Sequence, residues 1–140
     1  MGRTLLAALA GLATAFITIW LVEFAGHALY PPPPGIDPAN TADMGRLIGT
    51  LPMGALLMIV VAWVVGAFDG GFVAALLAGS ARPRLAALAP GVMVTAGVIG
   101  MSVAMPAHPA WMAVAGLLLP VPAALAGGAL ASALRGRTQR

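Results

Sequence analysis

Ionisable side chains are scarce in this sequence, so each one inside an apolar stretch is a candidate for chemistry. Glu23 and His27 lie four positions apart in one such stretch. This spacing places them on the same face of a helix, where a carboxylate can accept the imidazole N–H. Steps of three and four residues extend the face to Phe16, Trp20 and Tyr30. We therefore expect one polar and aromatic stripe along this helix.

Three interpretations of Glu23 and His27 stay open. The two groups satisfy each other and fix the loop that follows, or they face interfacial water, or they form a proton-linked, metal or cofactor site. His108, the second of the two histidines, would complete such a site, since imidazole and carboxylate bind divalent ions and two facing imidazoles bind haem. We expect no cofactor, and we keep haem or a divalent metal as the alternative.

The histidines share a spacing. Arg3 precedes His27 by the same twenty-four positions that separate Arg84 from His108. We interpret the equal spacing as the thickness of one bilayer, crossed twice, and keep a duplicated helical hairpin as the alternative. Aromatic residues gather at membrane interfaces. Two tryptophans are therefore expected in the outer half, Trp20 and Trp111.

Asp69 is a further ionisable group inside an apolar stretch, where it is flanked by Gly66 and Gly70-Gly71. Inserting a charge there costs about 2.5–3.5 kcal/mol. The Asp69 carboxyl must therefore be protonated, hydrogen-bonded or reached by an arginine from the interface, and we favour the arginine contact over a transport role. The candidate arginines are Arg3, Arg82 and Arg135.

The composition indicates a membrane protein. Hydrophobic residues make up 61% of the 140 positions, charged residues 8%, and the mean hydropathy is +0.99, whereas a soluble domain is about a quarter charged. The net charge of +3 comes from seven arginines that stand between apolar runs, so they indicate topology and not nucleic-acid binding. The absence of cysteine from the sequence excludes disulfides and thiolate chemistry.

The apolar runs predict one all-α membrane domain over residues 1–140. Four transmembrane helices are expected at about 4–29, 47–79, 85–105 and 110–134, since about 20 residues cross the hydrocarbon core. A proline-rich outer loop, 30–46, joins the first two. The second helix is overlong, so we expect it to be tilted or bent at Pro52 or at Gly70-Gly71. Pro120 and Pro122 should kink the fourth.

Each span carries small residues three or four positions apart, which allow helix backbones to approach in lipid. We expect these faces to pack a compact bundle and to leave the stripe free for another contact. The faces are Ala7, Gly11, Ala15, Thr18, Val22 and Gly26; Gly66, Gly70, Ala74 and Ala78; Ala96, Gly100 and Ala104; and Gly127 with Ala131.

The arginines predict the orientation of the spans. Six of them fall on one side of the four spans, and Arg46 lies on the other side with Asp37 and Asp43. Positively charged loops stay in the cytoplasm, so both termini should be cytoplasmic. The alanine-rich, lysine-free composition is typical of a GC-rich bacterium. We therefore expect a multi-pass protein of the bacterial inner membrane.

Three segments carry a resemblance to a known group. They are Val22-Glu23-Phe24-Ala25-Gly26-His27-Ala28-Leu29-Tyr30-Pro31, Gly66-Ala67-Phe68 with Gly70-Gly71, and His108-Pro109-Ala110-Trp111. The chain resembles small four-helix proteins of bacterial inner membranes with a VEFxGHxLYP-type first helix. The resemblance implies the four-helix fold and no activity, because none is assigned to that group.

The sequence contains no nucleotide-binding loop, nucleophile elbow or zinc-protease motif, so we do not expect an enzyme. We expect a protein that acts by helix association, as an accessory subunit of a membrane complex or as a homo-oligomer. Its partners would be lipid and other membrane subunits or copies of itself. The alternative is a carrier, a channel, or a haem-binding or metal-binding protein that uses Glu23, His27 and His108 near the outer leaflet.

Overall fold

The computed structural model describes residues 1–37, 40–80 and 82–138, and these form helices without strands. The elements are α1 (Gly2–Leu29), α2 (Thr41–Thr50), α3 (Met53–Ala78), α4 (Pro83–Ala104), α5 (Ala110–Leu118) and α6 (Pro120–Thr138). Four spans are long and apolar enough to cross a membrane, namely α1, α3, α4, and α5 together with α6. The predicted all-α bundle is confirmed, and the chain is a small multi-pass membrane protein.

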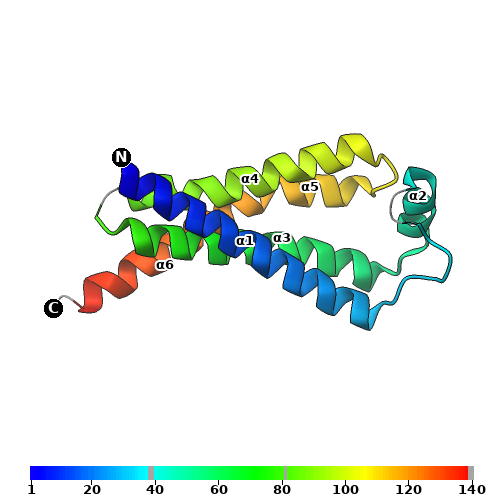
Figure 1. Ribbon diagram of the computed structural model, residues 1–140, viewed down its shortest axis with the longest axis horizontal. Coiled ribbons are helices and arrows are strands. Elements are labelled where there is room, and N and C mark those ends of the chain that lie inside the picture. The colour runs from blue at the N-terminus through cyan, green and yellow to red at the C-terminus, as the bar shows by residue number, and fades with distance from the viewer. Residues whose placement is uncertain (38–39, 81, 139–140) are drawn as a thin grey trace.

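The two ends of the bundle differ (Figure 1). Both termini lie at one end, here called the terminal end, and α2 lies at the other, here called the α2 end. The central helix is α3, which packs against α1, α4, α5 and α6. The positions that matter for function are therefore set by what α3 holds at each end.

The predicted second helix, 47–79, is divided into α2 and α3 at Pro52, one of the two places where a bend was expected, and the span itself is α3. A proline has no N–H to donate, so it cannot continue the α2 helix and instead precedes the first turn of α3. Helix α3 runs without a break through Gly70-Gly71. Helix α2 begins at Thr41, earlier than the start at 47 that was expected for the second helix.

The fourth span is broken at its first internal proline, as expected. Helix α5 ends at Leu118 and α6 begins at Pro120. Pro122 lies in the first turn of α6, where a missing N–H costs no helical hydrogen bond. The interruption therefore belongs to Pro120 and not to Pro122.

Small residues bring the backbones of α1 and α6 against α3. A Cβ built on Gly70 would lie 2.6 Å from the carbonyl oxygen of Gly11, and one built on Gly71 would lie 2.1 Å from that of Ala124. On α1, the buried residues include Ala7 and Gly11. The small-residue faces of the first, second and fourth spans are confirmed as packing surfaces.

The small-residue face expected for the third span is wrong. Ala96, Gly100 and Ala104 are exposed, and a Cβ on Gly100 would meet no atom within 4 Å. An alanine- and glycine-rich helix carries small residues on more than one face, so their spacing alone could not select the packed one. Helix α4 packs instead through Ala86, Ala87, Pro90, Gly91 and Val98.

Arginines cap α3 at the terminal end. The Arg3 Nε donates to the carbonyl oxygen of Leu77 at 3.0 Å, and an Arg135 nitrogen donates to that of Ala75 at 3.2 Å. These carbonyls lie in the last turn, where the helix dipole is negative. Arg140 lies outside the described residues. The expectation that this end faces the cytoplasm stays a prediction.

Candidate functional site

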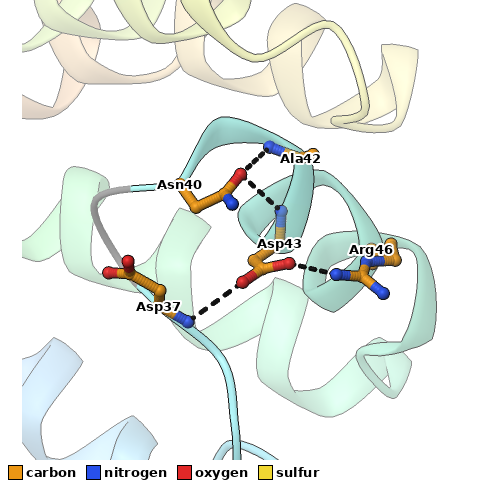
Figure 2. Close-up of polar contacts among 5 residues, drawn as sticks. All are labelled: Asp37, Asn40, Ala42, Asp43 and Arg46. Carbon is orange, nitrogen blue, oxygen red and sulfur yellow. Dashed lines mark hydrogen bonds and ion pairs between the residues drawn. The ribbon is translucent and has the colours of Figure 1, made fainter.

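Helix α2 is tied to the loop that precedes it (Figure 2). The Asn40 side chain accepts hydrogen bonds from the backbone N–H groups of Ala42 at 2.9 Å and Asp43 at 3.4 Å. The Asp43 carboxylate accepts the N–H of Asp37 at 3.3 Å and pairs with Arg46. The hydrogen bond from the Arg46 guanidinium, and then that from Asp37, lower the pKa of Asp43 below its ordinary 3.8. This network fixes where α2 begins.

A cavity of about 300 Å³ lies between α2 and the ends of the spans. This volume is at the lower end of the range of small-molecule sites, about 300–1,000 Å³. We call it the α2 cavity. Its wall consists of Glu23, Gly26, His27, Tyr30, Pro32, Met44, Leu47, Ile48, Leu51, Ala55, Met58, Ile59, Met101, Met105 and His108.

Four residues singled out in the sequence meet in this wall. Glu23, His27 and Tyr30 follow one another by four and three positions and so share one face of α1. His108 comes from the loop between α4 and α5. Since α1 and α4 both end at the α2 end, the fold brings both histidines of the chain and a carboxylate to one cavity.

Hydrogen bonds within the described residues use only part of the capacity of these polar groups. Within the described residues, Glu23 and His27 interact electrostatically but are joined by no hydrogen bond or ion pair. The His108 Nδ1 lies 2.9 Å from the carbonyl oxygen of Met105. A carbonyl oxygen only accepts, so Nδ1 carries the hydrogen and neutral His108 has its lone pair on Nε2.

Tyr30 is held against α3 by a glycine. A Cβ built on Gly54 would lie 2.2 Å from the Tyr30 hydroxyl oxygen. The absence of a side chain at Gly54 therefore lets the phenol approach the first turn of α3. This contact places the hydroxyl at the edge of the α2 cavity.

The two tryptophans expected in the outer half lie outside this cavity. Trp20 is 63% exposed on the surface of α1 and stacks on Phe24, with ring centroids 5.7 Å apart. Trp111 packs, partly buried, against a core cluster that includes Trp63 and Met112. The predicted stripe is therefore divided between the cavity and the outer surface of α1.

Asp69 also lies away from the α2 cavity. Its Oδ2 accepts a hydrogen bond from the Thr18 hydroxyl of α1 at 3.2 Å. The expected arginine contact is not found in the described part of the chain, because Arg3 and Arg135 bond to carbonyls at the end of α3 instead. Asp69 therefore serves the α1–α3 contact.

Four methionines of the wall were missed in the sequence. Met44, Met58, Met101 and Met105 line the α2 cavity. A methionine inside an apolar helix looks like any other apolar residue, so neither its type nor its spacing marks a site. Only the tertiary structure shows that residues from separate helices converge.

A second cavity, of about 190 Å³, lies between α1, α3 and α4. We call it the lateral cavity. Its wall is apolar and includes Phe16 and Trp63, and Trp63 is otherwise buried in the core. Met101 belongs to both walls, so the two cavities adjoin at this residue.

Neither a metal-binding cluster in the described part of the chain nor a similar protein assigns a role to the α2 cavity. No three His, Asp or Glu side chains of the described residues converge closely enough to hold a metal ion. The resemblance of the first helix to small inner-membrane proteins stays a prediction. Comparisons with protein-family models, with curated proteins and with solved structures give no match.

Proposed function

We propose that this membrane protein binds a small polar or ionic ligand in the α2 cavity through Glu23, His27 and His108. One observation carries the proposal: in a chain with few ionisable side chains, a carboxylate and both imidazoles line the same cavity. Polar groups are costly near lipid and mark functional sites when they gather. This is the carrier or cofactor-binding alternative of the sequence analysis.

The groups offer complementary interactions. Glu23 supplies a negative charge and His108 a lone pair on Nε2, while His27 and Tyr30 can donate hydrogen bonds. Helix α2 contributes the apolar side chains of Leu47 and Ile48 to the same wall, which makes this part of the wall apolar. Interactions with charged groups are stronger in such a setting than in water.

Thiol labelling tests whether a ligand can enter. The chain has no cysteine, so Ala55→Cys places a single thiol in the cavity wall. Ala62→Cys, on α3 outside both cavities and fully buried, is the matched control. We expect a small cationic methanethiosulfonate to label position 55 and not position 62. A position-55 thiol as slow as that at position 62 would overturn the proposal.

Native mass spectrometry tests what is bound. The protein would be released from its own membrane in mild detergent, as wild type and as Glu23→Gln. We expect a bound mass that is reduced in the variant, because the carboxylate charge is lost. A bound mass that is unchanged in Glu23→Gln, or no bound mass in either protein, would contradict the assigned role of Glu23.

Helix association is a second candidate, favoured by the unpacked face of α4. Ala96, Gly100 and Ala104 are exposed, and small residues of this kind are where membrane helices approach each other. Oxidation of Gly100→Cys in membranes should give a disulfide dimer faster than Leu130→Cys, an exposed position on α6. Equal rates would remove this candidate.

A further inference from the structure

Methionines are distributed unevenly over this protein. The chain has eight, and four of them line the cavity that also holds both histidines. Met44 comes from α2, Met58 from α3, and Met101 and Met105 from the end of α4. Thioether side chains therefore reach the α2 cavity from three helices.

Thioether sulfur and imidazole nitrogen form a distinctive set of metal donors. Soft thioethers select Cu(I), whereas carboxylate and carbonyl oxygens suit magnesium, calcium and manganese. Since His, Asp and Glu supply no group of three in the described residues, an ion held here would take sulfur ligands. The chain has no cysteine, so methionine is its sole source of sulfur.

The ring of His108 is already oriented for such an ion. Its Nδ1–H donates to the carbonyl oxygen of Met105 at 2.9 Å, which leaves the lone pair of Nε2 available to a metal ion. Metal-binding histidines characteristically donate their other ring N–H to a carbonyl or carboxylate. Met105 thus anchors the ring through its backbone while it contributes to the wall of the cavity.

The charge of the cavity favours a monovalent ion. Among the residues that line it, Glu23 is the one acidic side chain, and it is half-buried. A charge removed from water is costly unless an opposite charge compensates it. A single carboxylate balances one positive charge, and a divalent ion would leave a second one uncompensated.

We propose that the α2 cavity is a site for a monovalent soft metal ion, with Cu(I) as its representative. The ligands are Nε2 of His108 and the thioethers of Met101 and Met105, and Glu23 compensates the charge. Met44 closes the site from α2, and the three rotatable bonds of each methionine let its sulfur adjust to an ion. The inference rests on the proposed function, since it names the ligand class of the same cavity.

Metal titration tests the proposal directly. Protein without a histidine tag would be titrated without oxygen with Cu(I) against a Cu(I) chelator, and separately with Ag(I) and Zn(II). We expect one Cu(I) or one Ag(I) per chain and no stoichiometric Zn(II). X-ray absorption of the Cu(I) form should show sulfur and nitrogen neighbours. A preference for Zn(II), or a shell of oxygen alone, would overturn the proposal.

Paired variants identify the ligands. Met101→Leu with Met105→Leu should weaken Cu(I) binding at least tenfold, since even supporting groups of a metal site contribute about 10–100-fold. The matched control is Met53→Leu with Met93→Leu, both outside the α2 cavity, which should bind as wild type. Exchange of Met for Leu conserves volume, and thermal unfolding would confirm the fold. Equal Cu(I) affinity in the two double variants sinks the thioether assignment.

The metal proposal and the proposed function fail in different ways. If Ala55→Cys is labelled and a bound mass depends on Glu23, while neither Cu(I) nor Ag(I) binds, only the metal proposal is overturned. If the position-55 thiol is unreactive and no metal binds, both are overturned.

Discussion

Alanine substitutions at Gly71 and Gly127 test the backbone contact between α3 and α6. A Cβ on Gly71 would lie 2.1 Å from the carbonyl oxygen of Ala124 and 2.7 Å from its carbonyl carbon, and one on Gly127 would lie 2.1 Å from the carbonyl oxygen of Phe68. Ordinary contact begins at 3.4 Å. A backbone atom cannot rotate aside as a side chain can, so the two helices must move apart.

Two opposing effects set the change in the free energy of unfolding. Alanine favours the helix over glycine by about 0.5–1 kcal/mol. Overpacking a close contact costs about 1–3 kcal/mol, and contact with backbone places Gly71 and Gly127 near the upper limit. The expected net loss is about 2 kcal/mol at each. At Gly97 and Gly100 an added Cβ would meet no atom within 4 Å, so only the helix preference remains and stability should rise.

The assay is unfolding followed by circular dichroism, in a detergent that keeps the chain monomeric. Gly71→Ala and Gly127→Ala should unfold earlier than wild type, and Gly97→Ala and Gly100→Ala later. The sign therefore differs for one chemical change within one protein. Equal effects at Gly71 and Gly97 would refute the packing argument.

Two further predictions concern the polar groups outside the α2 cavity. Because the folded pKa of Asp43 lies below 3.8, its contribution to holding α2 is complete above that pH and is lost as the pH falls through the folded value. A spin label at Gly49→Cys should therefore become more mobile below pH 3.8 in wild type, and show no such transition with Asp43→Asn. For Thr18 and Asp69, a double-mutant cycle with Thr18→Val and Asp69→Asn should give a coupling of about 0.6 kcal/mol, the average for membrane side-chain hydrogen bonds; a coupling near zero would show that the bond contributes nothing.

The spans and their bends could be predicted because they depend on local chemistry. Length and apolarity identify a helix in lipid, and a proline lacks the N–H that continues a helix, although α4 runs on through Pro90. Both Pro52 and Pro120 therefore marked real breaks. The start of α2 was harder to predict. Its N-cap, Asn40, lies in a polar and proline-rich segment, and such a composition is typical of a loop.

The packing face of α4 could not be predicted from spacing. Ala96, Gly100 and Ala104 repeat the pattern that is buried on α1 and α3, yet they are exposed. The packed face is decided by the neighbour that crosses it, since a Cβ on Gly91 would lie 2.9 Å from the Cα of Val121 in the fourth span. That neighbour is separated in sequence by a whole helical hairpin.

The candidate site, like the fold, could be predicted only in part from the sequence. Glu23 and His27 stand out in the sequence because ionisable groups are costly in lipid. Because Arg3 precedes His27 by the same number of residues as Arg84 precedes His108, the two histidines are expected at one depth in the membrane. The depth of a residue does not show toward which neighbour its side chain points, and it does not show whether two side chains form a hydrogen bond. The structure places them on a shared cavity without a mutual hydrogen bond in its described residues, so an arrangement in which Glu23 and His27 satisfy each other lacks its main contact. Both residues line the α2 cavity, which is the reason to propose a ligand for them.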